Sequence, residues 1–380
     1  MSAGLRGPGS ESMARKLKSD KLLFLATLLL VLASIVMVYS ASAVLAMDRF
    51  HRPYLFLIKQ AMWASLGLAM LGIVMRVDYR TWKQPLLIRL SLGAVGLALI
   101  AVLFSSPING TRRWFGVGGF GVQPSELAKL AVIFFTAALL ERRMHRIDEV
   151  RYSLAPLAAV VGVITILVLA EPDFGTAASI VAVAALMVFA AGLNLKYGLY
   201  ALLAIVPAGA WALVSASYRM KRLTAFLCPE CDPTGSGFQL LQSLIAVGTG
   251  GVGGKGLVAG VQKLFYLPEP HTDFIYAVIA EELGLIGATL TLAAFLVIAW
   301  RGVQVAGRAP DRFGALLALG LTGMVAVQAF INLSVVLGLM PTKGIPLPFV
   351  SAGGSSLLIN LVGMGILLNV SQHASAVHEA

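Results

Sequence analysis

Residues 267–300 read LPEPHTDFIYAVIAEELGLIGATLTLAAFLVIAW and join a polar, proline-rich approach to an apolar run over 275–300. A hydrophobic run of about 20 residues is long enough to cross the hydrocarbon core of a bilayer as a helix. All the ionisable residues of this stretch lie in its first half, between Glu269 and Glu282. The stretch therefore predicts a transmembrane helix that is preceded by a loop with ionisable side chains.

Apolar runs of similar length recur along the rest of the chain. Of the 380 residues, 58% are hydrophobic and 12% are charged, whereas roughly a quarter of the residues are charged in an average soluble domain. We expect an all-α, polytopic integral membrane protein with about ten transmembrane helices, and this composition excludes a large soluble catalytic domain. Besides 275–300, the expected spans are 22–46, 55–76, 86–104, 126–141, 154–170, 176–192, 198–216, 314–339 and 355–371.

The distribution of basic residues predicts the orientation. An inside N-terminus places more than half of the 29 Lys and Arg residues on the cytoplasmic side, as the positive-inside rule requires. The expected domains are a basic cytoplasmic tail over 1–21, one membrane domain over 22–372 and a cytoplasmic tail over 373–380. The first apolar run is too long for a cleavable signal peptide. The net charge of +11 is scattered in small groups, which favours contact with anionic lipid and argues against nucleic acid.

This orientation puts three segments rich in Gly and Pro on the outer face: 105–125, the large extracytoplasmic loop 217–274, and 340–354. Irregular backbone close to the hydrocarbon region is tolerated only where protein or water satisfies its polar groups. We therefore expect these loops to line a cavity, and we expect the function to reside there.

Asp273 is the first candidate for chemistry because it lies where a span meets the outer surface. An ionisable residue at such a position is a functional candidate by default. Desolvation would raise its pKa toward the range that suits proton abstraction. The alternative is a structural helix N-cap, a position that Asp often fills.

Three other charged groups have local explanations. Glu126 and Lys129 lie three residues apart, so they can pair on one helical face and reduce each other's desolvation cost; structural and functional roles are both open. Glu281 and Glu282 point about 100° apart on a helix, which favours a structural contact with another span. The two carboxylates of Glu171-Pro172-Asp173 fit an acidic wall, a cation site or, by preference, helix capping.

Cations also occur in the outer loops. Arg112 and Arg113 precede the aromatic residue Trp114, and planar, bidentate guanidinium groups suit lipid phosphate. Lys343 follows Pro341-Thr342, in a rigid turn that presents one ammonium group at the outer surface.

Cys228 and Cys231 enclose a short CPEC sequence. A disulfide is favoured if the loop faces an oxidising compartment. A zinc site would need His271 and a carboxylate as further ligands, so we expect no metal site. The chain contains no Walker loop, GxSxG elbow or HExxH helix, which argues against ATP-driven transport and zinc proteolysis.

Taken together, the loop motifs over residues 20–372 resemble those of the SEDS family of membrane glycosyltransferases, named for shape, elongation, division and sporulation. Pro341-Thr342-Lys343-Gly344 is similar to the division branch rather than the elongation branch. The chain departs from the family at Ala352, where a Tyr is usual, and at the two cysteines. The matching motifs are Asn109-Gly110-Thr111-Arg112-Arg113-Trp114, Gln123-Pro124-Ser125-Glu126-Leu127-Ala128-Lys129, Glu171-Pro172-Asp173-Phe174-Gly175, Gly235-Ser236-Gly237-Phe238-Gln239, His271-Thr272-Asp273-Phe274 and Gly353-Gly354-Ser355-Ser356.

This resemblance implies an inverting, β-1,4-forming peptidoglycan glycosyltransferase that polymerises lipid II, the undecaprenyl-diphosphate-linked disaccharide pentapeptide. It implies Asp273 as the general base, with substrate binding by Arg112, Arg113, Lys343, His271, Gln239 and Ser356. No nucleotide is needed, because the activated bond arrives with the lipid. A divalent cation is compatible with the reaction, although no ligand pattern in the chain calls for one.

The resemblance also implies partners and a location. The chain has no domain that could cross-link peptides, so we expect a class B penicillin-binding protein of the FtsI type as partner, together with other membrane proteins of the division machinery and membrane lipids. The expected location is the bacterial cytoplasmic membrane at the division septum. The alternatives are a lipid II flippase, an elongation-type polymerase and a non-catalytic division scaffold.

Overall fold

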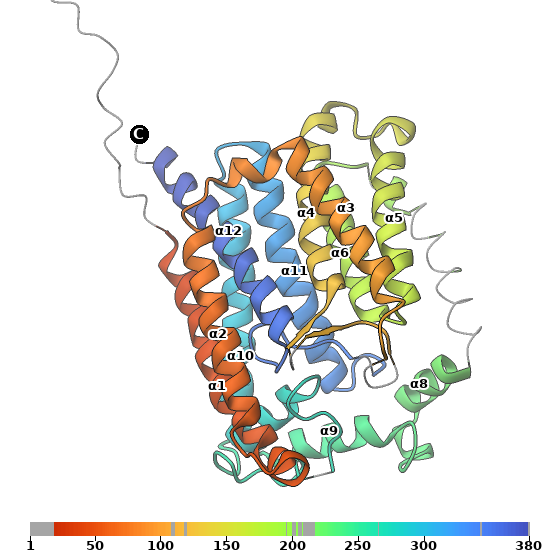
Figure 1. Cartoon of the computed structure of the whole chain (residues 1–380), viewed down its shortest axis with the longest axis vertical. Helices are drawn as coiled ribbons and strands as arrows, with labels where there is room; N and C mark the ends of the chain where they lie inside the picture. Colours follow the sequence, from red (N-terminus) through yellow and green to blue (C-terminus); the bar gives the residue numbers. More distant parts are fainter. Residues whose placement is uncertain are drawn as a thin grey trace, which may run out of the picture.

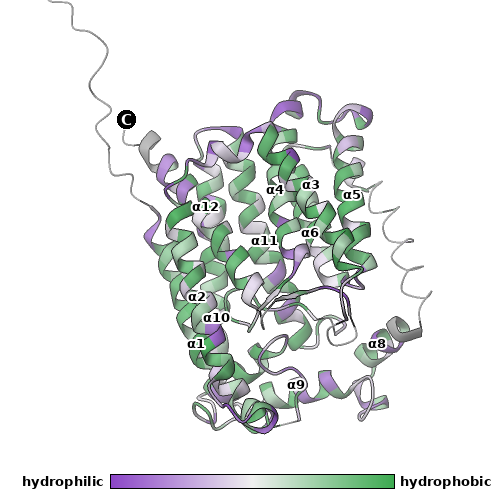
Figure 2. Cartoon of the chain, in the orientation of Figure 1, coloured by the Kyte–Doolittle hydropathy of each residue, from purple (hydrophilic) through white to green (hydrophobic). Residues whose placement is uncertain are grey.

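The computed structural model describes residues 19–378, apart from 108–110, 118–119, 195, 200–202, 204–206, 208–216, 265 and 343. Its long helices form a bundle whose two ends are polar, while hydrophobic residues cover most of the helix lengths (Figures 1 and 2). These helices are α1 (Lys21–Phe50), α2 (Leu55–Val74), α3 (Pro85–Val102), α4 (Pro124–Arg143), α5 (Ala155–Ala170), α6 (Phe174–Ala190), α10 (Ile275–Gly307), α11 (Arg312–Val336) and α12 (Gly354–His378).

Helix α11 lies at the centre of the bundle. It packs against α4, α6, α10 and α12, and its surface is largely buried. Helices α1 and α2 form an outer layer, with α1 against α10 and α2 against α12. Helices α3 and α5 cover the opposite side, where they contact α4 and α6.

Polar contacts join the beginning of α1 to α10 and to the last part of α12 at one end of the bundle, which we call the terminal face. The backbone N–H of Asp20 donates to Ser371 Oγ at 3.1 Å, and the Asp20 carboxylate accepts from Arg301. Asn369 of α12 accepts from the N–H of Tyr79 at 2.9 Å. The opposite end, which we call the loop face, carries the segments around 105–125, 217–274 and 340–354 (Figure 1).

Local sequence explains where several helices begin. Asp20, Asp173 and Asp311 cap α1, α6 and α11 by accepting backbone N–H bonds from the first turn. Proline occupies the start of α3 and α4, where its missing N–H costs nothing.

The expectation of a multi-pass, all-α membrane protein is confirmed. Seven described helices are long and apolar enough to cross a membrane. Two further expected spans coincide with α4, which carries charged residues, and with α6, which has 17 residues. Most of the expected span 198–216 lies outside the described residues.

Two of the expected segments outside the spans contain helix. Residues 373–378, which belong to the expected C-terminal tail, continue α12. The loop 217–274 contains α8 (Ser217–Leu227) and α9 (Phe238–Thr249). Helix α9 is amphipathic: Leu240, Ser243 and Ala246 are buried at three-residue spacing, and Ser243 Oγ donates to the carbonyl of Val336.

The described strands are two short ones on the loop face. Strands β1 (Phe115–Val117) and β2 (Phe120–Val122) pair in antiparallel register, with Gly116 opposite Gly121. Short helical turns complete the chain at Tyr79–Lys83, Met144–Arg146, Val150–Leu154 and Pro229–Cys231.

Candidate functional site on the loop face

Other parts of the chain hold the segment that carries Asp273 by donating hydrogen bonds to three of its consecutive backbone carbonyls. The carbonyl of His271 accepts from the N–H of Ala352 at 2.9 Å, and that of Thr272 accepts from Ser351 Oγ at 2.5 Å. The carbonyl of Asp273 itself accepts from Asn332 Nδ2 of α11 at 2.8 Å. The backbone of Asp273 is therefore bound directly by α11 and by the segment that precedes α12. Because the bond at Ala352 uses its backbone, the absence of a Tyr side chain there leaves this contact intact.

The carboxylate of Asp273 has no hydrogen bond or ion pair to any residue that the structure describes. Asp273 is half-buried, and the backbone of Gly344 passes so close that a Cβ there would lie 2.8 Å from Asp273 Oδ2. The helix N-cap is Phe274, which makes no side-chain capping bond. The capping alternative for Asp273 is thus not what the structure shows.

Burial and neighbouring charges set the acidity of Asp273. Burial raises the pKa of this carboxyl to about 7, and the negative charges of Glu269 and Asp173 act in the same direction. The positive charges of Arg113 and Arg222 oppose the shift. A group with a pKa near neutrality is well matched to general-base catalysis.

A second polar cluster lies close to Asp273 and joins the beginnings of α4, α6 and α12. Asp173 accepts from Gln123 Nε2 at 3.0 Å and from both the N–H and the hydroxyl of Thr176. The N–H of Gln123 donates to Ser355 Oγ. Asp173 therefore has the capping role that the sequence favours, and it also brings negative charge toward Asp273.

Arg113 fastens the turn between α5 and α6. Its Nε and Nη2 donate to the carbonyls of Glu171 and Pro172, at 2.7 and 2.6 Å. The Glu171 side chain is fully buried, and neither of its oxygens has a hydrogen-bond partner among the described residues. Burial raises the pKa of Glu171 to about 8, with Asp173 adding to the shift and Arg113 opposing it. The raised pKa favours the protonated form of Glu171 near neutral pH.

Glu126 and Lys129 are in contact inside the bundle. Lys129 Nζ lies 2.7 Å from Glu126 Oε2, and the two side chains are 4% and 2% exposed. The same ammonium donates to Gln328 Oε1 of α11 at 2.8 Å, and Gln328 Nε2 donates to the carbonyl of Pro346. Asn332, one helical turn further along, binds the carbonyl of Ile345. The pair is thereby connected to the segment that holds Asp273.

The other candidate substrate-binding residues differ in how deeply they are buried. His271 is buried against Phe56, with a ring-centroid distance of 4.7 Å; burial lowers its pKa, opposed by Glu269 and assisted by Arg49. Ser356 is buried in the first turn of α12, where its hydroxyl accepts from Asn360. Gln239 is half-buried at the beginning of α9. Lys343 lies outside the described residues.

Arg112 is exposed, and its one hydrogen bond to the described residues runs from Nη1 to the carbonyl of Leu103. Arg222 of α8 is a cation that the sequence analysis did not select. Its guanidinium lies within hydrogen-bond range of the carbonyl of Thr342, and its charge acts on Asp273. Gln328 and Asn332 were also missed, although two amide side chains four residues apart in an apolar span are a recognisable signal of interhelical bonding.

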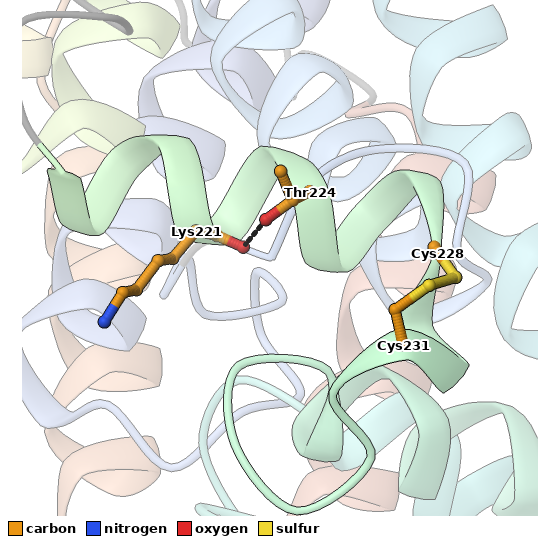
Figure 3. The surroundings of a disulfide bond; sticks show 4 residues. All are labelled: Lys221, Thr224, Cys228 and Cys231. Carbon is orange, nitrogen blue, oxygen red and sulfur yellow. Dashed lines mark hydrogen bonds between the residues drawn. A yellow bond between two sulfur atoms is a disulfide. The ribbon is translucent and has the colours of Figure 1, made fainter.

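Cys228 and Cys231 form a disulfide between the end of α8 and the following turn (Figure 3). In the same helix, Thr224 Oγ1 donates to the carbonyl of Lys221 at 2.9 Å. This is the disulfide that the sequence favours for an oxidising compartment. No group of three or more His, Cys, Asp and Glu side chains within the described part of the chain is placed to hold a metal ion.

These features define a multi-pass membrane protein with a general-base candidate and several cations at one end of its helical bundle. The family model described as "Cell cycle protein", which covers FtsW, RodA and SpoVE, matches residues 20–376. The chain belongs to this FtsW/RodA/SpoVE family, which is the family that the loop motifs resemble.

Two curated relatives are similar over nearly their whole length. A probable peptidoglycan glycosyltransferase FtsW of Geobacter sp. (strain M18) is 44% identical over 93% of this chain and 96% of its own. Stage V sporulation protein E of Bacillus subtilis (strain 168) is 43% identical over 95% of this chain and 99% of its own.

Solved structures agree with these relatives. A chain of a peptidoglycan synthase complex that coordinates polymerization and crosslinking superposes with a TM-score of 0.77 and 32% identity, over 94% of this chain and 99% of that one. The rod shape determining protein RodA of Thermus thermophilus superposes with a TM-score of 0.69 and 28% identity, over 94% of this chain and 98% of its own.

Proposed function

We propose that this protein is a peptidoglycan glycosyltransferase that polymerises lipid II, with Asp273 as its general base. The observation that carries the assignment is the carboxylate of Asp273, which is fixed through its backbone, free of hydrogen bonds to the described residues and has a pKa of about 7. Relatives that cover nearly the whole chain bear the name of this activity.

The proposed reaction follows from the chemistry of the donor. The 4-hydroxyl of the acceptor sugar attacks the anomeric carbon of the donor in line, a new C–O bond forms, and the bond from carbon to the diphosphate oxygen breaks. The hydroxyl proton passes to Asp273, and the diphosphate leaves with the bonding electrons. Attack opposite the leaving group converts the α-linked donor into a β-1,4 linkage. Cations must stabilise the departing charge, and Arg112, Arg113 and Lys343 are the candidates, to which we add Arg222.

The polar loop face corresponds in this proposal to the outer side of the bacterial cytoplasmic membrane. Basic residues that follow α2, end α4 and follow α10, such as Arg76, Arg143 and Arg308, then lie toward the terminal face, which would be cytoplasmic. A division-type activity would further place the protein at the septum. The similarity to a sporulation protein at 43% identity makes a sporulation-specific role the alternative at this level.

We infer a class B penicillin-binding protein of the FtsI type as the partner. One similar solved chain belongs to a complex that coordinates polymerization and crosslinking. Other membrane proteins of the division machinery, and the lipids around the bundle, complete the expected surroundings.

One assay separates this function from a lipid II flippase, the second candidate. The flippase is favoured by the interruption of α10 at Gly284, because discontinuous helices are common in transporters. The purified protein and its partner are incubated with fluorescent lipid II in detergent, where no membrane separates two sides. Long glycan chains support the polymerase. Their absence, together with lipid II translocation in vesicles, would establish the flippase instead.

Replacing Arg113 by Lys is expected to lower kcat/KM for lipid II by about tenfold or more, since a hydrogen bond to a charged group contributes about 1.5–3 kcal/mol. Lysine keeps the charge but cannot hold the carbonyls of Glu171 and Pro172 together. The matched variant is Arg112→Lys, which alters an exposed side chain with one bond and should have a smaller effect. Unchanged affinity and turnover in both variants would show that the arginines have no part in diphosphate binding.

Replacing both Cys228 and Cys231 by Ser is expected to leave polymerisation unchanged. The disulfide joins residues only three positions apart, so it constrains far less chain than the loops whose disulfides contribute about 2–4 kcal/mol. Polymerisation and zinc content, by mass spectrometry, are measured on the same preparations. Stoichiometric zinc in the parent together with lost activity in the variant would contradict the disulfide and indicate a metal-organised loop.

A further inference from the structure

Helix α10 is interrupted at Gly284, which adopts φ 64° and ψ −161°. Such a backbone conformation strongly favours glycine. A Cβ on Gly284 would also lie 2.3 Å from the backbone nitrogen of Gly254 and 2.5 Å from the carbonyl oxygen of Val252. The interruption separates a short outer segment, residues 275–283, from the long remainder of the helix.

The loop that follows α9 satisfies the backbone groups that this interruption releases. The N–H groups of Leu285 and Ile286 donate to the carbonyls of Gly251 and Val252, at 2.9 and 3.3 Å. In return, the carbonyls of Glu281 and Glu282 accept from the N–H groups of residues 255 and 256, at 3.0 and 2.9 Å. Four backbone hydrogen bonds thus join the loop to both sides of the break.

The side chains of Glu281 and Glu282 add further contacts between the loop and α10 at the same place, which we call the junction. Glu281 accepts from the N–H groups of Val261 and Gln262 and pairs with Lys255 Nζ at 2.7 Å. Glu282 accepts from the N–H of Val258 and pairs with Lys263.

Ser40 of α1 completes the group around Glu282. Its hydroxyl donates to that carboxylate at 2.7 Å and accepts from Lys263 Nζ at 2.8 Å. Lys263 and Glu282 are 3% and 0% exposed. Because Ser40 belongs to α1, this contact binds the junction to a helix that is distant in sequence.

The backbone bonds between residues 255–256 and residues 281–282 close the chain between 256 and 281 into a loop. Asp273 belongs to this loop. Residues 275–283 form nine helical positions, so about 13 Å of helix separates the junction from Asp273. A small rotation at the junction would therefore move Asp273 relative to Asp173 and Arg113. Such a movement would be costly, since a misplacement of about 1 Å can reduce a reaction rate by about 10²-fold.

We propose that Lys263, Glu282 and Ser40 are positioning residues for the transfer reaction, which they serve by fixing the outer segment of α10, and with it Asp273, against α1. None of the three would contact substrate. The inference rests on the proposed function for its kinetic readout, but the anchoring itself can be measured without any activity.

The first test is hydrogen exchange on the purified protein with its partner. In Lys263→Met, the buried carboxylate of Glu282 loses its counter-ion, so amides 275–283 are expected to exchange faster while those of 287–305 keep their protection. Unchanged protection of 275–283 would overturn the proposal whether or not the protein polymerises lipid II. Since this readout needs no catalysis, failure of the positioning role is distinguishable from failure of the proposed function.

The second test is kinetic. Lys263→Met is expected to reduce kcat by about tenfold or more, toward about 10²-fold, with little change in KM for lipid II. Lys263→Arg, which keeps the charge, should restore most of the activity, and Lys263→Met with Glu282→Gln should recover part of it by removing the unpaired charge. Displacing Asp273 toward water should also move the acid limb of the pH profile to lower pH. The charged groups around Asp273 are Glu269, Asp173, Arg113 and Arg222.

The chain provides a matched control in a second ion pair of α10, which joins this helix to the N-cap of α1. Arg301 of α10 lies 2.7 Å from Asp20, the cap of α1, on the terminal face and beyond Gly284. Arg301→Met is expected to leave kcat and the pH profile nearly unchanged. Equal losses in Arg301→Met and Lys263→Met would overturn the proposal, because they would indicate general packing of α1 on α10. If Lys263→Met does not fold, Ser40→Ala is tested instead, by hydrogen exchange of amides 275–283 and by kcat.

Discussion

Asp273→Asn is expected to abolish glycan polymerisation, with a loss of about 10²–10⁴-fold in kcat if only general-base catalysis is removed. Asn has nearly the same size and polarity, and the backbone bonds that hold residues 271–273 do not involve the side chain. Expression, thermal stability in detergent and binding of the partner should therefore be unchanged. The measurement is the yield of glycan chains from fluorescent lipid II in the presence of the partner.

The pH dependence gives an independent check on the same residue. A base must be deprotonated, so activity is expected to fall as the pH decreases through about 7, the pKa to which burial raises Asp273. Glu269→Gln removes a nearby negative charge that contributes to this shift. It should therefore lower the pKa of Asp273 and move the acid limb to lower pH, while the plateau activity is retained.

Two outcomes would contradict the role of Asp273. Retention of a substantial part of the wild-type activity by Asp273→Asn would exclude it as the general base. An acid limb that does not respond to Glu269→Gln would assign the limb to another group, of which Glu171, with its raised pKa of about 8, is the foremost.

Lys129→Met is expected to destabilise the protein by about 3–5 kcal/mol, the usual cost of leaving one buried charge without its partner. Glu126 is 2% exposed and Lys129 is its only ion-pair partner among the described residues. The variant also removes the donor to Gln328, which links the pair to the carbonyl of Pro346. The measurement is thermal unfolding in detergent, with and without the partner.

A matched control exists in Arg146 and Glu149, which have the same three-residue spacing but are 51% and 49% exposed. Arg146→Met should change the stability by about 0–1 kcal/mol, as is typical of surface pairs. The contrast between the two variants separates the effect of burial from that of the pairing itself.

Charge exchange, Glu126→Lys with Lys129→Glu, is expected to be more stable than either single exchange. The recovery should be incomplete, because a carboxylate at position 129 would face Gln328 Oε1, while the Gln328 amide nitrogen is already bound to Pro346. An exchange variant no more stable than the single exchanges would indicate separate roles for the two residues, with Glu126 acting toward the reaction cavity.

Much of the fold follows from short-range information in the sequence. Apolar runs of membrane-spanning length predict nine of the long helices described, because a chain in lipid must satisfy its backbone hydrogen bonds within each segment. The contact of Glu126 with Lys129 follows from their spacing on one helix. The capping role of Asp173 and the placement of Asp273 at the entrance to a span are likewise local.

The environment of Asp273 could not be predicted in the same way. Its backbone carbonyl is held by Asn332, and its acidity depends on burial and on the charges of Glu269, Asp173, Arg113 and Arg222. Apart from Glu269, these residues are between about fifty and a hundred and sixty positions away in the chain, and no periodic pattern connects them.

The class of protein, the approximate limits of most spans and the residue types available for catalysis follow from the amino-acid sequence alone, because each depends on hydrophobicity and spacing within one segment. The folded chain is needed to show that the glycine-rich loop 251–256 completes the interrupted helix α10 and that Lys263, Glu282 and Ser40 meet beside it. Such contacts join segments that are far apart in the chain. Their partners become defined only when buried polar groups must each find a hydrogen bond within the folded bundle.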